Sequence, residues 1–108
     1  MESSAEFRIS NLGPRAASAR DTFAFAVLES NDVVIRCPLG DDYSLNDKLV
    51  WLWGGLNHQR RKLKALQAEG AVLSCVCINR SGKLVLQPNA AEFLHLTGAS
   101  LVVTTGAA

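Results

Sequence analysis

A stripe of leucines between residues 44 and 70 constrains the fold of this chain more than any other feature of its sequence. Apolar side chains recur there at alternating spacings of four and three residues, which is the period of one face of an α-helix. The stripe comprises Leu45, Leu49, Leu52, Leu56, Leu63 and Leu66, and Gln59 fills the place where a leucine is missing. The pattern predicts one amphipathic helix whose leucines pack on a sheet built largely from the C-terminal half.

The residues at the two ends of this helix define where it starts and stops. Ser44 and Asp47 match a capping box in which Asp replaces the usual Glu. Gly70 stands where a left-handed residue commonly ends a helix. A straight helix of this length reaches about 40 Å at about 1.5 Å per residue, which exceeds any predicted strand. We therefore expect it to overhang the sheet or to bend at Gly54-Gly55.

Four strands and a second helix complete the predicted core. Side-chain alternation and turn residues place strands at 33–37, 71–79, 83–87 and 100–105, and the second helix at 89–97. Because residues 71–79 are mostly apolar on both faces, that strand is expected to be central. Right-handed crossovers turn this order into a ferredoxin-like βαββαβ core, an antiparallel sheet with two helices on one face. The whole chain, residues 1–108, is predicted to form a single α+β domain.

Local markers support the C-terminal boundaries. Residues 80–83 contain a Ser-Gly pair that predicts a tight hairpin turn. Pro88 is expected to stop the returning strand, and Asn89 to cap the second helix together with Glu92. Gly98 is expected to end that helix.

The N-terminal third is predicted to add a strand or hairpin at one edge of this sheet. Residues 6–10 and 22–29 alternate larger apolar residues with others, as strands do, and residues 30–32 indicate a turn. The loop at 11–21 carries Gly13-Pro14 and is expected to contain a helical turn. Residues 1–5 and 106–108 are expected to be frayed tails.

Composition excludes several classes of protein. The formal net charge is +1, whereas a dedicated DNA-binding domain usually carries a strong basic excess. The sequence has no apolar run of the roughly 20 residues that span a bilayer and no signal-peptide pattern at its start, so we expect a cytoplasmic protein. Cys37, Cys75 and Cys77 are then expected to be reduced thiols. A Cys-x-Cys pair alone does not complete a zinc site, so no metal and no cofactor are predicted.

Six residues of the long helix form the candidate binding site. Two tryptophans lie on opposite flanks of the leucine stripe, where they either cover the edge of the core or anchor a partner. The basic residues near the end of the helix either form a solvated, dipole-matched face or bind an acidic partner or a phosphate. The six candidates are Trp51, Trp53, His58, Arg60, Arg61 and Lys64.

No catalytic motif is apparent. His95 is the main candidate for acid–base chemistry, but it has no recognised nucleophile or carboxylate partner in the sequence. The chain is therefore predicted not to be an enzyme.

The helix and the segments that follow it carry a family resemblance. The matching residues are Ser44-Leu45, Leu49, Trp51-Leu52, Glu69-Gly70-Ala71, Leu73-Ser74-Cys75, Leu84, Leu86, Pro88, Phe93-Leu94 and Thr97 to Leu101, and Phe7 to Ser10 matches an opening strand. In these residues the chain resembles a family of small bacterial domains of unknown function. It departs from the family between Asn11 and Pro38, where this chain is shorter and has no Trp. The resemblance implies an α+β fold and a bacterial or phage source, and it supplies no catalytic residues.

Together these observations favour a non-catalytic protein-binding module. Its expected partner is another protein or a second copy of the chain, as in immunity or inhibitor proteins and phage antagonists of host defence, a step made by analogy. The alternative is a nucleic-acid-binding module that uses the open sheet face or the basic helix end. A small enzyme ranks last.

Overall fold

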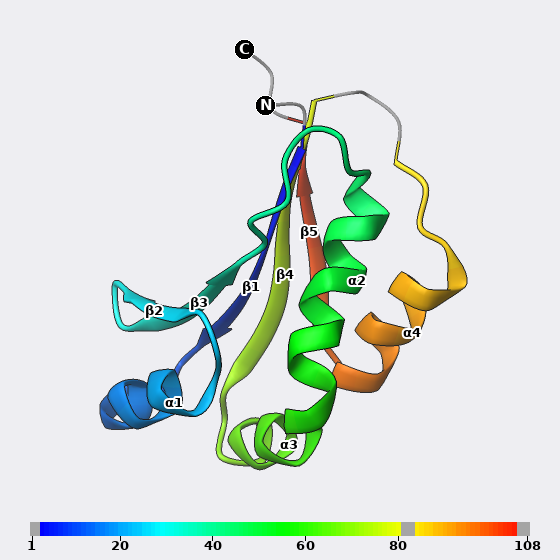
Figure 1. Ribbon diagram of the computed structural model, residues 1–108. Coiled ribbons are helices and arrows are strands. Elements are labelled where there is room, and N and C mark those ends of the chain that lie inside the picture. The colour runs from blue at the N-terminus through cyan, green and yellow to red at the C-terminus, as the bar shows by residue number, and fades with distance from the viewer. Residues whose placement is uncertain (1–2, 81–83, 106–108) are drawn as a thin grey trace.

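The structure, a computed structural model, describes residues 3–80 and 84–105. Its strands and helices are interspersed along the chain and form a sheet with helices packed against it (Figure 1). The elements are β1 (Ser3–Ser10), α1 (Ala16–Thr22), β2 (Ala26–Glu29), β3 (Asp32–Arg36), α2 (Leu45–Leu56), α3 (Arg60–Ala68), β4 (Val72–Asn79), α4 (Pro88–Thr97) and β5 (Ser100–Thr104).

Five strands form one mixed sheet in the order β2-β3-β1-β4-β5 within the described residues. The pairs β2–β3, β1–β3 and β1–β4 are antiparallel, whereas β4 and β5 are parallel. The α+β class is therefore confirmed, and the prediction of a purely antiparallel sheet is wrong. The parallel pair arises because α4 connects β4 to β5 as a crossover, which returns the chain in the same direction.

The predicted strand at 83–87 is wrong for its described part. Leu84 to Gln87 belong to no strand, and the predicted turn at 80–83 lies mostly outside the described residues. The backbone N–H of Gln87 donates to Oδ1 of Asn46 in α2, at 2.8 Å, and so has a partner other than a neighbouring strand. Pro88 then occupies the first turn of α4, a position that needs no N–H donor.

Asn89 is likewise not the N-cap of α4, because Gln87 takes that place without a side-chain hydrogen bond. Oδ1 of Asn89 accepts from the backbone N–H of Ala90 at 2.8 Å and from the amide of Asn46 at 3.2 Å. Gly98 ends α4 with a φ of 68°, as predicted.

The N-terminal strand lies in the interior of the sheet, between β3 and β4, and not at an edge. Ala5, Phe7 and Ile9 are buried, so one face of β1 contributes directly to the core. Residues 3–5, expected to be part of a tail, belong to β1 because Ser3 to Ala5 pair with Cys77 to Asn79.

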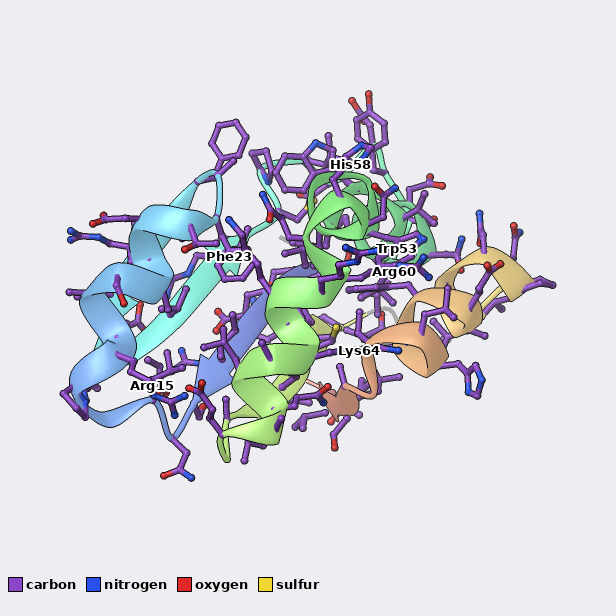
Figure 2. The ribbon with its side chains drawn as sticks, turned by 90° about the horizontal axis from the view of Figure 1, so that it is seen from below. Arg15, Phe23, Trp53, His58, Arg60 and Lys64 are labelled. Carbon is purple, nitrogen blue, oxygen red and sulfur yellow. The ribbon has the colours of Figure 1, made fainter. Side chains whose placement is uncertain are left out.

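The β2–β3 hairpin occupies the edge beyond β1. Its turn contains Ser30 and Asn31 with φ of 50° and 69°, the positive values that two-residue hairpin turns require. The predicted strand at 22–29 is shorter, because α1 continues to Thr22 and β2 begins only at Ala26. Phe23 between them is buried and points inward beside α1 (Figure 2).

The leucine stripe packs into the core, which confirms the central prediction. Leu45, Leu49, Leu52, Leu56 and Leu63 are buried. The predicted capping box is present: Oγ of Ser44 accepts from the N–H of Asp47 at 3.1 Å, and the Asp47 carboxylate accepts from the N–H of Ser44 at 3.4 Å. Gly70 has a φ of 102° and follows the C-terminus of α3.

The stripe does not form one continuous helix, however. A 3₁₀ turn at Asn57–Gln59 separates α2 from α3, just after the predicted bend at Gly54-Gly55. The turn coincides with the position where Gln59 replaces a leucine, so the interruption falls where the stripe itself is interrupted.

The helices pack on one face of the sheet and leave the other face open (Figure 1). The core between the layers includes Phe7, Leu49, Cys75 and Phe93, each with no exposed surface. None of the helices within residues 3–80 and 84–105 is long and apolar enough to cross a membrane.

Candidate protein-binding surface

The open face of the sheet carries two adjoining groups of side chains. Successive residues of a strand point to opposite faces, so the residues of β1 and β4 that alternate with the buried ones face away from the helices. On β1, β2 and β3 this face carries charged residues and also Val27 and Val34. On β4 and β5 it carries four β-branched apolar residues and also Ser74, Ser100 and Thr104.

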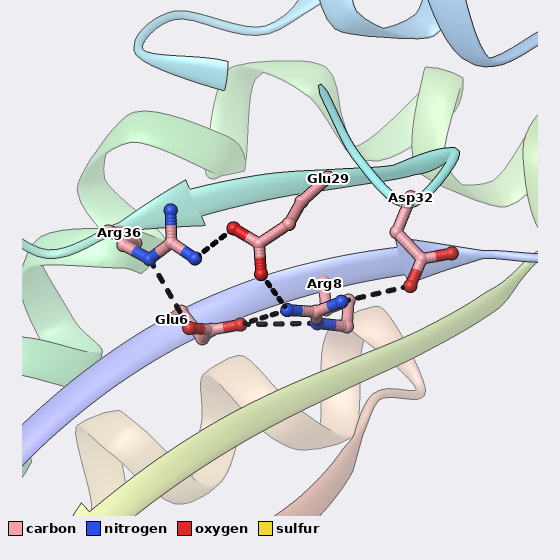
Figure 3. A network of polar contacts seen from close by, with 5 residues as sticks. All are labelled: Glu6, Arg8, Glu29, Asp32 and Arg36. Carbon is pink, nitrogen blue, oxygen red and sulfur yellow. Dashed lines mark hydrogen bonds and ion pairs between the residues drawn. The ribbon is translucent and has the colours of Figure 1, made fainter. Parts of the chain in front are cut away.

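We call the first group the charge cluster: Glu6, Arg8, Glu29, Asp32 and Arg36 (Figure 3). Arg8 lies at its centre, and its guanidinium donates to Glu6 at 2.9 Å, to Asp32 at 3.0 Å and to Glu29 at 3.1 Å. Arg36 pairs with Glu29 and lies 3.5 Å from Glu6. Three carboxylates thus hold two guanidinium groups in fixed positions.

The ion pairs keep the members of the cluster charged. Hydrogen bonds to Asp32 and then Glu6 raise the pKa of Arg8. The hydrogen bond to Glu29 raises the pKa of Arg36, and the hydrogen bonds from Arg36 and then Arg8 lower the pKa of Glu29. Val34, opposite Arg8 in the register, is fully buried although it lies on this face, which indicates that the long side chains of the cluster cover it.

We call the second group the apolar strip: Val72, Val76, Ile78 and Val102. Val76 and Val102 are register partners on β4 and β5, and Val76 is also the register partner of Glu6 on β1. The exposed fractions are 54% for Val72, 37% for Ile78 and 47% for Val102. The apolar strip is therefore continuous with the charge cluster and accessible from the same side.

The structure places the six predicted site residues on the helical layer, away from this surface. Trp53 stacks on Phe93 with ring centroids 5.3 Å apart, and Trp51 lies 5.9 Å from the ring of Phe25. Both tryptophans are partly buried against the core, which agrees with the interpretation that they cover its boundary.

The four basic candidates are exposed on the turn after α2 and on α3. Figure 2 shows Arg60 and Lys64 on the side of α3 toward α4. Among the described residues, none of the four forms an ion pair. The four residues are His58, Arg60, Arg61 and Lys64.

Sequence reasoning missed the charge cluster because its members are far apart in the chain. The alternation of Glu6 and Arg8 on one strand was a signal, but the partners on β2 and β3 could be assigned only after β1 was placed next to β3. The prediction put β1 at the edge, and no cluster follows from that arrangement.

Sequence reasoning also missed the buried Lys48 in α2. This side chain is 1% exposed, and its Nζ donates to the carbonyl oxygen of Ser3 at 2.8 Å and to the Ser3 hydroxyl at 2.9 Å. Lys48 thus connects the first turn of α2 to the start of β1.

The cysteines are free thiols. Burial raises the pKa of Cys75 and raises the pKa of Cys77 to about 11, so both thiols stay protonated and unreactive near neutral pH. Within residues 3–80 and 84–105, no group of three His, Cys, Asp or Glu side chains could hold a metal ion.

Comparison of the chain with family models, curated proteins and solved structures finds no match. The surface must therefore be interpreted from its own chemistry.

Proposed function

We propose that this chain is a non-catalytic protein-binding module and that the partner docks on the open face of the sheet. The observation that carries the proposal is the apolar strip, which lies exposed beside the charge cluster on the face opposite the helices. Protein interfaces commonly combine an apolar centre with a polar rim, and these two groups supply both.

The rigidity of the charge cluster supports this function. Side chains that must be ordered on binding reduce affinity, by about 0.5–1.5 kcal/mol each. Arg8 is already held by three carboxylates. Binding of a partner to the cluster therefore costs less side-chain entropy, because the charges are ordered beforehand. A fixed pattern of charge also favours one partner over others.

The same cluster argues against nucleic acid on this face. Nucleic acids bind to arginines and lysines whose positive charges replace the counterions of the phosphates. Arg8 and Arg36 are both paired with carboxylates instead. Sheet surfaces that bind RNA also stack bases on aromatic side chains, and the described residues of the charge cluster and apolar strip include none. A weak contact of nucleic acid with the exposed basic residues of α3 remains the alternative.

The finer description of the fold is also a proposal. Residues 3–79 run β1, α1, β2, β3, α2–α3, β4, and their strands lie in the order β2-β3-β1-β4 with antiparallel neighbours. We propose that this segment is the ferredoxin-like core and that α4 and β5 extend it. The core would then begin about 30 residues earlier than the sequence predicted.

A role as an immunity or inhibitor protein of bacterial or phage origin rests on the family resemblance and on analogy. Inhibitor proteins of this size commonly act by occupying a surface of their target. The open face of the sheet is a preformed surface that is suited to occupying a target in this way.

Affinity capture with matched variants tests the proposal. Three baits are compared: the full wild-type chain, its Val102→Asp variant and its Lys64→Glu variant. Val102→Asp places a charge in the apolar strip, and Lys64→Glu changes the predicted basic site. We expect a partner that the wild type and Lys64→Glu retain and Val102→Asp loses, with light scattering to detect self-association. Equal retention by both variants, or loss only with Lys64→Glu, would contradict the open-face assignment.

A further inference from the structure

An apolar pocket opens on the helical side of the molecule, between α2 and the turn that precedes β2. Its volume is about 310 Å³, at the lower end of the range of small-molecule sites. Eight residues line it: Ala24, Phe25, Ile35, Trp51, Leu52, Gly54, Gly55 and Leu56. The lining belongs to the opposite face from the charge cluster, so the pocket is independent of the proposed docking surface.

Two adjacent glycines in α2 leave one wall of the pocket open. A glycine in a helix is unfavourable relative to alanine. A Cβ atom built on Gly54 or on Gly55 would meet nothing within 4 Å, so no close packing requires either glycine. Because the two glycines have no side chains, free space remains beside Trp51.

Phe25 adds a second unfavourable feature at the same place. Its φ is 62°, a left-handed conformation that costs energy for any residue with a Cβ and is rare for an aromatic one. The side chain is also 77% exposed, so burial offsets little of that cost. Residues held in such conformations concentrate at binding and catalytic sites.

The chemistry of the lining defines what the pocket accepts. None of the eight residues is ionisable, so a charged ligand would lose its hydration without a counter-charge. The rings of Phe25 and Trp51 lie 5.9 Å apart with an interplanar angle of 46°, and aromatic rings favour offset or tilted packing on another ring. The indole N–H of Trp51 is the one polar side-chain group among the lining residues.

From these features we propose that the pocket binds a small, uncharged aromatic molecule of one or two rings. The ligand ring packs against Phe25 and Trp51 and fills the space that Gly54 and Gly55 leave. This site goes beyond the proposed protein-binding function and does not depend on it.

Titration of the full chain with indole, followed by two-dimensional ¹H–¹⁵N NMR, tests the proposal. We expect saturable shifts of the Gly54 and Gly55 amides and of the Trp51 indole N–H. The indole N–H of Trp53, which stacks on Phe93 outside the lining, should shift little and serves as an internal control. Indole-3-acetate, which has the same ring and a carboxylate, should bind at least about tenfold more weakly.

Two variants separate binding from folding. Gly55→Leu fills the pocket and should abolish the shifts, whereas Ala17→Leu, at an exposed site on α1, should leave them unchanged. Phe25→Gly suits the positive φ, so it should raise the melting temperature and yet weaken indole binding at least about fivefold.

The outcomes that overturn the proposal are specific. In the first, indole shifts none of these signals up to its solubility limit. In the second, indole-3-acetate binds as tightly as indole, and in the third, the Phe25→Gly variant binds indole as tightly as the wild type. The first result would indicate that the pocket instead receives a side chain of a docking protein. If Gly55→Leu does not fold, the Phe25→Gly variant and the two probes still decide.

Discussion

Replacement of Arg8 by Met tests whether the charge cluster stabilises the sheet. Arg8 hydrogen-bonds three carboxylates from β1, β2 and the start of β3, and its side chain is 24% exposed. Partly exposed ion pairs contribute about 0.2–1 kcal/mol each, so three pairs on one guanidinium give about 0.6–3 kcal/mol, with a central value of about 1–2 kcal/mol. Met keeps most of the apolar length of the side chain, so the loss reports mainly on the charge. We expect the free energy of unfolding to fall by about 1–2 kcal/mol at neutral pH.

The effect should depend on pH in one direction. Arg36 and Arg8 lower the pKa of Glu29 in the folded state, so the stability that this carboxylate contributes is present above its ordinary pKa of 4.5 and is lost as the pH falls through the lowered value. Without Arg8, Glu29 keeps only Arg36 among the two partners that lower its pKa, so the variant has less of this stability to lose. The difference between wild type and Arg8→Met should therefore shrink at about pH 3.

Urea unfolding followed by circular dichroism at the two pH values measures both effects. The matched control is Arg20→Met, because among the described residues Arg20 pairs only with its exposed neighbour Asp21, and we expect a change below about 0.5 kcal/mol. A loss for Arg8→Met no larger than that of the control, or a loss that stays constant between the two pH values, would refute this account of the cluster.

Three further outcomes are expected. Leu49→Ala should lower the free energy of unfolding by about 2–5 kcal/mol because Leu49 is fully buried; Leu28→Ala, at a 39% exposed site, should cost far less in the same urea titration, and equal losses would contradict the assigned core. Ser44→Ala should cost about 1 kcal/mol because the capping box is lost, and an unchanged unfolding midpoint would argue against that cap. Cys75 and Cys77 should react with a thiol reagent such as Ellman's reagent only after unfolding, since burial raises the pKa of both; rapid labelling of more than one thiol per native chain would show that β4 is not interior, because only Cys37 is partly exposed.

The long helix was predictable because its signals are local. The stripe, the capping box at Ser44 and the glycine at residue 70 all lie within the segment they define. The interior position of β4 followed in the same way from its apolar residues on both faces. The 3₁₀ turn at Asn57–Gln59 was not predicted, although Gln59 interrupts the stripe there, because the leucine spacing resumes in the same register at Leu63.

The strand order was not predictable from local patterns. The Ser-Gly pair after β4 suggested a hairpin, but Gln87 bonds to Asn46, which lies 41 residues away in the sequence. Likewise, the central place of β1 depends on pairing with β4, whose residues follow more than 60 positions later. The charge cluster depends on the pairing of β1 with β3, so the incorrect placement of β1 at an edge also hid the candidate surface. The flanking positions of Trp51 and Trp53 needed only the helix.

The interior position of β1 has a consequence for how the chain acquires its structure during synthesis. Of the described strands, this one leaves the ribosome first, yet its second neighbour, β4, is complete only at Asn79. Contacts so distant in sequence slow folding, and a strand whose apolar face is uncovered until its partner is made is open to aggregation. The nascent chain is therefore expected to rely on chaperones until most of its length has been translated.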